Sequence, residues 1–162
     1  MPAKSKFKIS SLLIVLLIIL ASFFQPDLEP TTSISKNLVT RVIDGDTIEL
    51  STKEKVRYIG VDTPERNECF FEEAKAINSQ LVLNKQVRLV KDVSEVDRYG
   101  RLLRYVYVGD LMINYYLVRQ GYAYASTYPP DVLYSHKFAK AQSLARAENK
   151  GFWEEKCYDK EQ

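Results

Sequence analysis

Residues 42–65 read VIDGDTIELSTKEKVRYIGVDTPE, and the interpretation of the whole chain starts from this stretch. β-Branched residues lead into Asp44–Asp46, where a glycine between two aspartates is typical of a turn. Thr47–Leu50 alternates apolar and polar side chains and predicts a strand that returns antiparallel. A third strand is predicted over Glu54–Val61, and Pro64 ends it. The stretch therefore predicts successive short strands with carboxylates beside their turns.

The rest of the domain continues the mixture of strands and helices. Further strands are predicted over Leu38–Ile43, Gln86–Lys91 and Leu102–Val108. Helices are predicted over Phe70–Asn84, Ile113–Gln120 and from about Asp131, a candidate N-cap, to Asn149, and Trp153 is expected in the core. This pattern favours an α+β fold in which five strands form a small closed or partly closed barrel.

The N-terminus has a different composition from the rest. Lysines precede an unbroken aliphatic run over Leu12–Leu20, which is the layout of a secretory signal. The run is short for a full membrane span, and both a cleaved signal peptide and an uncleaved anchor through residues 7–24 fit it. We expect residues 1–24 to be this segment, 25–36 a linker, and 37–162 the domain, placed outside the cytoplasm.

Net charge gives no support for nucleic-acid binding. The formal charge of the chain is +2, but from Asn37 onward 19 basic residues face 19 acidic ones. Any phosphate recognition must therefore come from a few well-placed cations rather than from a basic surface.

The cysteine and histidine content limits the possible chemistry. Cys69 and Cys157 favour a disulfide if the domain is exported, and otherwise remain two unpaired thiols. His136, the single histidine, is expected on an exposed helix face. A pair of histidines acting as acid and base, or a histidine-rich zinc site, is therefore excluded.

Three aspartates are candidates for a metal site. Asp44, Asp46 and Asp62 all stand beside predicted turns, where their charges would repel one another. A hard divalent cation would remove that cost, and oxygen ligands alone point to calcium or magnesium. Ordinary turn chemistry is the alternative for Asp-Gly-Asp. An EF-hand is excluded, since its 12-residue loop with a terminal glutamate is absent.

Other charged and aromatic residues could act on a phosphate near such a metal. Glu65 follows the rigid Pro64 and could accept a proton from an attacking water, or could be a surface residue. Arg57 and Arg101 suit bidentate phosphate contact; taken singly, each is better explained as a salt-bridge partner of an acid in the domain, but together with the metal candidates the phosphate role is favoured. Tyr99 and Tyr128 could stack on a base or contact a phosphate, or belong to the core or rim.

Four motifs stand in order along the chain and are followed by Trp153; they are Val42–Thr47, Arg57–Glu65, Asp97–Arg101 and Leu117–Gly121. In these motifs the sequence resembles the staphylococcal nuclease (thermonuclease) family, and the resemblance covers about Val39 to Trp153. Each motif alone is modest, but four in the same order are highly specific.

The resemblance implies a five-stranded OB-fold barrel with three helices and calcium-dependent hydrolysis of DNA and RNA that leaves 3′-phosphate ends. By position it implies that Asp46, Asp62 and the carbonyl of Thr63 hold calcium, with Asp44 behind them. It also implies that Arg57 and Arg101 stabilise the transition state. The same match makes Glu65 the general base and Tyr99 and Tyr128 the residues that contact substrate.

The chain departs from the family pattern in two ways. The loop after Glu65 is short, because a helix begins soon after Cys69, and the domain lacks a lysine-rich character.

A catalytically silent binding module and a domain that calcium merely stabilises are the alternatives to a nuclease. The retained charged residues argue against the first, and two arginines beside a cation argue against the second. No protein partner is implied, and we expect a monomer.

Overall fold

The computed structural model describes residues 36–154 and Cys157. The predicted signal or anchor segment and the linker before Lys36 lie outside the described residues. In the described part, no helix is both long and apolar enough to cross a membrane. The elements in chain order are β1 (Val39–Val42), β2 (Thr47–Leu50), β3 (Lys55–Tyr58), β4 (Val61–Asp62), α2 (Phe71–Val82), β5 (Arg88–Val90), β6 (Leu102–Val108), β7 (Leu111–Met112), α3 (Ile113–Arg119), β8 (Tyr124–Ala125), α4 (Ser135–Ala147) and the 3₁₀ helix η1 (Gly151–Trp153).

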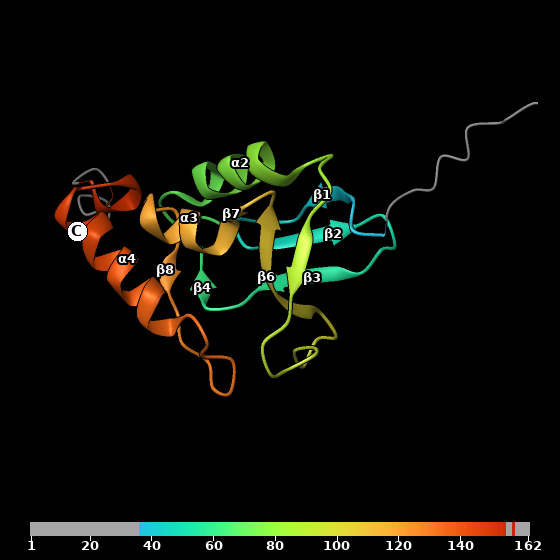
Figure 1. Cartoon of the computed structure of the whole chain (residues 1–162). Helices are drawn as coiled ribbons and strands as arrows, with labels where there is room; N and C mark the ends of the chain where they lie inside the picture. The colour runs from blue at the N-terminus through green and yellow to red at the C-terminus, as the bar shows by residue number, and fades with distance from the viewer. Residues whose placement is uncertain (1–35, 155–156, 158–162) are drawn as a thin grey trace, which may run out of the picture. The chain divides into compact units, whose positions relative to one another are not determined.

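A mixed sheet organises the domain, with strand order β1-β2-β3-β6-β5 and β7 paired to β6 (Figure 1). β1, β2 and β3 pair antiparallel through short turns, as the sequence predicts. β6 runs parallel to β3, whereas β5 and β7 are antiparallel to β6. The two-residue strands β4 and β8 form a separate antiparallel pair. The three predicted helices are confirmed as α2, α3 and α4.

Of the closed or partly closed barrel predicted from the sequence, the closed form is wrong, because no ladder between the named strands of the described region closes the sheet. Its ends meet through an isolated bridge between Leu38 and Gln86 and through backbone hydrogen bonds around Val39. Asn84 has a left-handed φ of 57°, and β5 begins only at Arg88, so residues 84–87 bond to Asn37 and Val39 without forming part of a named strand.

A glycine also divides the third predicted strand, Glu54–Val61, into β3 and β4. Gly60 has a φ of 77°, which residues with a side chain rarely adopt. A Cβ at this position would lie 2.6 Å from the Phe138 ring of α4. The turn therefore sends the chain away from the main sheet, and β4 pairs with β8 next to α4.

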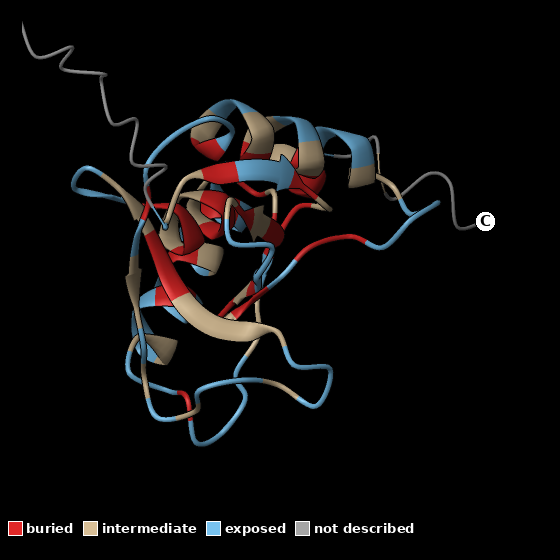
Figure 2. Cartoon of the chain, turned by 90° about the vertical axis from the view of Figure 1, so that its right-hand side faces the viewer, coloured by how far each residue is buried: buried red, intermediate tan, exposed pale blue. Residues whose placement is uncertain are grey.

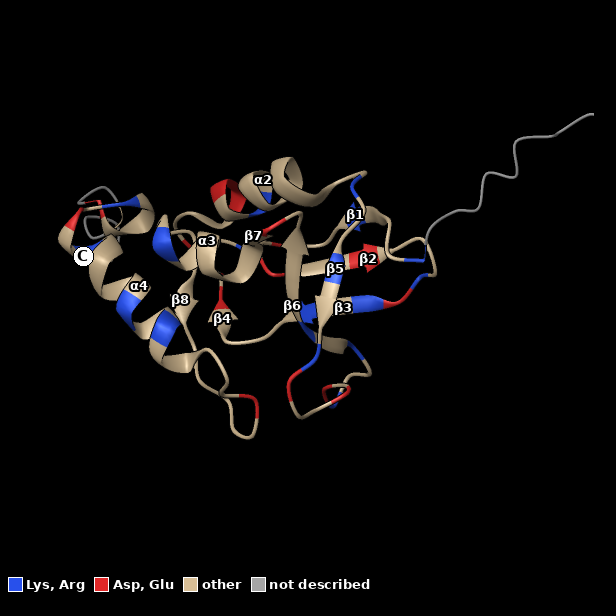
Figure 3. Cartoon of the chain, viewed as in Figure 1, with Lys and Arg blue, Asp and Glu red and all other residues tan. Residues whose placement is uncertain are grey.

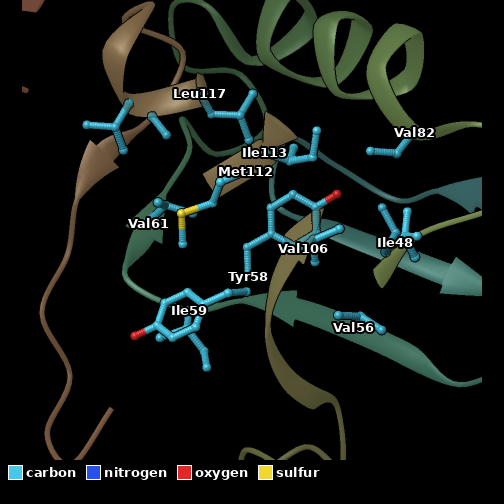
Figure 4. Close-up of a cluster of buried hydrophobic side chains, with 14 of the residues drawn as sticks. Ile48, Val56, Tyr58, Ile59, Val61, Val82, Val106, Met112, Ile113 and Leu117 are labelled. Atoms are coloured by element: carbon cyan, nitrogen blue, oxygen red, sulfur yellow. The ribbon is translucent and has the colours of Figure 1, made fainter. Parts of the chain in front are cut away.

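The core lies between the sheet and the helices, where buried residues of separate elements meet (Figure 2). Its labelled members come from five strands, from the turn after β3, from α3 and from the end of α2 (Figure 4). Tyr58, Tyr105 and Phe138 are the largest fully buried side chains. The aromatic side chains of Tyr105 and Phe138 have ring centroids 6.1 Å apart. This packing joins α4 to β6.

The last helix begins later than predicted. α4 starts at Ser135, so the predicted N-cap role of Asp131 is wrong. The Asp131 carboxylate instead accepts hydrogen bonds from the backbone amides of Val93 and Ser94, at 2.9 and 2.8 Å. Asp131 therefore joins the loop before α4 to the loop between β5 and β6.

A second buried cluster holds the C-terminal part of the described chain. Trp153 is buried as predicted and packs with Phe152 and Ala145, while Phe70 borders the same cluster. The predicted disulfide is present between Cys69 and Cys157, which are 88 positions apart in sequence. The bond fixes the chain before α2 to the segment after η1.

Removing the disulfide should destabilise the domain. Replacing Cys69 and Cys157 by serine should lower the free energy of unfolding by about 2–5 kcal/mol, because the unfolded chain is then free of an 88-residue cross-link. Urea unfolding with and without reductant measures this effect. Reductant should lower the stability of the wild type and leave the double variant unchanged; equal midpoints for both proteins without reductant would contradict the prediction.

Candidate functional site

The turn between β1 and β2 presents two aspartates. The backbone amides of Ile43 and Asp44 donate to the Thr47 carbonyl and close the turn. The Asp46 amide donates to the Asp44 carboxylate at 3.1 Å. This hydrogen bond uses the side chain of Asp44 to shape the turn, while Asp46 points into the domain and is only 4% exposed.

Gly45 lets this turn approach the end of β4 closely. A Cβ on Gly45 would lie 2.7 Å from side-chain atoms of Thr63, closer than real Cβ contacts. The close approach allows the Thr63 amide and hydroxyl to donate to Asp46 Oδ2, at 2.9 and 3.1 Å. Two chain segments that are well separated in sequence thus share one carboxylate.

Arg57 lies at the centre of this group. Its Nη1 lies 3.0 Å from Asp46 Oδ2, and its Nη2 lies 2.7 Å from Asp62 Oδ1. Nη1 also donates to the carbonyls of Tyr58 and Val61, at 3.1 and 2.8 Å. The guanidinium therefore joins the β1–β2 turn to both ends of the turn between β3 and β4.

The environment of Asp46 penalises a negative charge. Burial raises the pKa of the Asp46 carboxyl group to about 7; Arg57 and the hydrogen bonds from Thr63 lower it, and Asp44 raises it further. A carboxylate in such a position gains from a nearby cation. Arg57 supplies one positive charge in this structure, and a divalent cation would supply more.

The donor set fits a hard cation. Asp44, Asp46, Asp62 and the Thr63 carbonyl offer oxygen, and His136, the single histidine of the chain, is exposed on α4. Within residues 36–154 and Cys157, no three acidic, histidine or cysteine side chains gather as a complete metal cage. A bound ion would therefore need backbone carbonyls and water as well, as calcium and magnesium commonly do.

A second arginine is held by the loop before β6. Asp97 accepts hydrogen bonds from the amides of Tyr99 and Arg101, at 2.8 and 3.0 Å, and from Arg101 Nε at 2.6 Å. Burial raises the pKa of Asp97, but these hydrogen bonds outweigh it and lower the pKa overall. Among the described residues, no hydrogen bond or ion pair engages the terminal guanidinium nitrogens of Arg101. Those nitrogens remain available to an anion.

A pocket of about 470 Å³ brings several of these residues together. Its lining includes Arg57, Asp62, Tyr99, Arg101 and Tyr128. The two tyrosines are 68% and 77% exposed, so their rings border the pocket as predicted rim residues rather than core residues. Basic and acidic positions are interspersed along the strands, helices and loops of the domain (Figure 3).

Glu65 lies outside this pocket. It is exposed in the loop between β4 and α2, its backbone amide donates to the Glu68 carboxylate at 2.6 Å, and its carbonyl accepts from the Glu68 amide. The structure therefore gathers Arg57, Asp62 and Arg101 around one pocket but does not include the predicted base in its lining.

Sequence reasoning missed the residues that hold the pocket wall in place. Asp131 lines the pocket and connects its two loops. Asp92 Oδ2 joins the same loops by accepting from the Leu133 amide and the Tyr105 hydroxyl, both at 2.9 Å. The aspartate after Pro129-Pro130 was a usable signal, because aspartate after a turn often accepts backbone hydrogen bonds.

Comparison with known proteins identifies relatives of the chain. A family model described as Staphylococcal nuclease homologue matches residues 55–155. The chain is 40% identical over 126 residues to a thermonuclease of Staphylococcus intermedius, covering 72% of this chain and 75% of that protein. It is 39% identical over 124 residues to a thermonuclease of Staphylococcus hyicus, covering 71% and 73%. It is 36% identical over 129 residues to the endonuclease YncB of Bacillus subtilis, covering 73% and 61%.

The close approach at Gly45 can be tested directly. Gly45→Ala should lower the free energy of unfolding by about 1–3 kcal/mol, because the added methyl group overlaps Thr63. It should also speed hydrogen exchange of the Thr63 amide, which donates to Asp46. Gly109→Ala is the control, since its Cβ meets no atom within 4 Å and only the backbone is strained. Unchanged exchange at Thr63 would contradict the prediction.

Asp131 should make stability depend on pH. Burial raises the pKa of Asp131, but the hydrogen bonds from Ser94 and Val93 outweigh it, so the folded-state pKa is below the ordinary value. Its stabilisation is therefore present above the unfolded pKa, about 4, and lost as the pH falls through the folded pKa. Asp131→Asn should be less stable than the wild type at neutral pH, and urea unfolding should show this gap shrinking in acid. Asp110→Asn, in an exposed turn, should show no such change; a constant gap for Asp131→Asn would overturn the assignment.

Proposed function

The chain belongs to the staphylococcal nuclease family, and from this premise we propose that it is a calcium-dependent endonuclease that hydrolyses DNA and RNA to products with 3′-phosphate ends. That the protein is a nuclease, and so a phosphodiester hydrolase, follows from the family match and from 40% identity to a thermonuclease. The calcium requirement, the products and the role of each residue belong to the proposal.

The observation that carries the proposal is the pocket shared by Arg57, Arg101 and Asp62. Two guanidinium groups on one pocket suit a phosphodiester, because each can form paired hydrogen bonds to phosphate oxygens. In the proposed reaction, both arginines stabilise the charge that develops on the phosphate as water attacks. The available terminal nitrogens of Arg101 support this role.

Calcium is proposed to be held by Asp46, Asp62 and the Thr63 carbonyl, with Asp44 behind them. The high pKa of the buried Asp46 carboxyl supports this assignment, since a cation removes the cost of its charge. When bound, calcium would supply positive charge to the phosphate group. In this structure Arg57 forms ion pairs with both proposed carboxylate ligands, Asp46 and Asp62. These ion pairs would break most readily when a phosphate replaces the carboxylates as the anion bound to Arg57.

Glu65 is proposed to accept the proton of the attacking water. Its support is its position two residues after Thr63, in an exposed loop. The carboxylate would have to turn toward the pocket when substrate binds, and catalytic contacts often tighten only in that complex. Tyr99 and Tyr128 are proposed to contact the sugar–base part of the substrate, as their exposed rings at the rim allow.

The protein is proposed to act outside the cytoplasm as a monomer, either secreted or tethered to the membrane through residues 7–24. The disulfide between Cys69 and Cys157 supports an oxidising compartment. Fractionation of the producing cells tests this location, and recovery in the cytosol alone would contradict it.

The reaction can be tested with single-stranded DNA and with RNA in calcium, in magnesium and in EDTA. Cleavage should require calcium and leave 3′-phosphate ends. Arg57→Ala and Arg101→Ala should each lower kcat by about 10²–10³, because a preorganised charge on the transition state is lost. Glu65→Gln should lower kcat by about 10²–10⁴ by removing the proton acceptor.

Arg88→Ala is the matched control for the arginine variants. Arg88 lies on β5, packs over the Tyr107 ring at 4.0 Å and does not line the pocket, so its removal should leave kcat almost unchanged. Absence of cleavage in calcium by the folded, oxidised wild type would contradict the proposal and favour the alternative of a catalytically silent binding module. Full activity in Glu65→Gln would exclude Glu65 as the proton acceptor and leave the rest of the proposal unaffected.

A further inference from the structure

A buried asparagine connects helix α2 to the aspartate turn. Asn78 lies within α2, is 0% exposed, and has no charge of its own. Its Nδ2 donates to the Asp44 carbonyl at 3.1 Å, and its Oδ1 accepts from the Tyr58 hydroxyl at 2.9 Å. Both ends of the amide are therefore used, as a buried polar side chain requires.

Tyr58 reaches the same turn from the sheet. It is 1% exposed, and burial raises the pKa of its hydroxyl far above the ordinary value, so the hydroxyl stays protonated and donates to Asn78. Its backbone amide donates to the Asp46 carbonyl at 2.9 Å. Asn78 and Tyr58 thus contact the carbonyls on either side of Gly45 and contact each other.

This contact fixes the part of the turn that its own hydrogen bonds leave open. Within the turn, the Thr47 carbonyl and the Asp44 carboxylate serve as acceptors, but none of these hydrogen bonds engages the Asp44 carbonyl. Among the described residues, Asn78 is the side chain that donates to that carbonyl. The orientation of the peptide between Asp44 and Gly45 therefore depends on α2.

We propose that Asn78 is a positioning residue that holds the Asp44–Asp46 turn in the geometry required to bind calcium, an inference that rests on the proposed function. In this proposal Asn78 itself contacts neither substrate nor metal. It acts through the Asp44 carbonyl, which belongs to the turn that presents the Asp46 carboxylate to Thr63 and Arg57. A partner behind a metal-binding carboxylate typically changes metal affinity or activity by about 10–100-fold when it is removed.

A purely structural role is the competing explanation, because the same amide also satisfies the Tyr58 hydroxyl inside the core. The two roles separate in a double variant. Asn78→Leu alone leaves the Tyr58 hydroxyl and the Asp44 carbonyl without partners. Tyr58→Phe combined with Asn78→Leu removes the stranded hydroxyl as well, which should recover stability but not the bond to Asp44.

The experiment uses the full oxidised chain and compares both variants with Val82→Ala. Val82 is 0% exposed on the same helix and belongs to the apolar core, so its truncation lowers stability without altering a polar contact. Calorimetric titration measures calcium affinity, and kinetics at saturating calcium separate kcat from KM. Hydrogen exchange of the Asp46 amide in calcium-free protein reports on the turn itself.

We expect Asn78→Leu and the double variant to bind calcium about 10–100-fold more weakly than the wild type, and Val82→Ala to bind it with unchanged affinity. Both Asn78 variants should also exchange the Asp46 amide faster than Val82→Ala does. Wild-type calcium affinity and slow Asp46 exchange in a stably folded double variant would overturn the inference.

Failure of the proposed function would look different. In that case the wild type itself would bind no calcium and cleave nothing. Faster exchange at Asp46 in both Asn78 variants would still show that Asn78 orders the turn, whereas unchanged exchange would overturn that as well.

Discussion

The site depends on one buried carboxylate, that of Asp46. Burial works against its charge, and the domain compensates with donors from three separate places in the chain: Thr47 in β2, Arg57 in β3 and Thr63 after β4. These donors can meet only if the β1–β2 turn, the centre of the sheet and the end of β4 pack together. The stabilisation of this one buried charge therefore links the fold to the site. Gly45 permits the turn to approach Thr63 closely.

Much of the fold follows from local sequence signals. The alternating segments gave β1, β2, β3, β5 and β6 close to their observed positions, and helical periodicity gave α2, α3 and α4. What failed depends on distant contacts. The split at Gly60 depends on the distant Phe138 ring, which leaves no room for a side chain at that position. The two-residue strands β4 and β8 exist because they pair with each other. Strands so short carry no periodic signal of their own.

The site was predictable to the extent that its residues stand in motifs. Arg57, Asp62 and Arg101 were identified from sequence and share one pocket in the structure. Asp92 and Asp131 were missed, since each acts on a loop about 40 residues away and nothing local distinguishes it from a turn aspartate. Asn78 was missed for the same reason: in sequence it is one polar residue on a helix, and only burial between Tyr58 and Asp44 reveals its use.

The pairing of Arg57 explains how a domain with balanced charge could act on a polyanion. Arg57 holds Asp46 and Asp62 by ion pairs, whereas Arg101 shares only its Nε with Asp97. An anion alone at Arg57 would compete with two carboxylates, and a cation alone at those carboxylates would leave the guanidinium facing a like charge. If a cation and an anion bind together, the carboxylates contact the cation and Arg57 contacts the anion, so each broken ion pair is replaced by another contact between opposite charges. The arrangement therefore favours joint occupation by a cation and a phosphate, and it does so through placed pairs rather than through a basic surface.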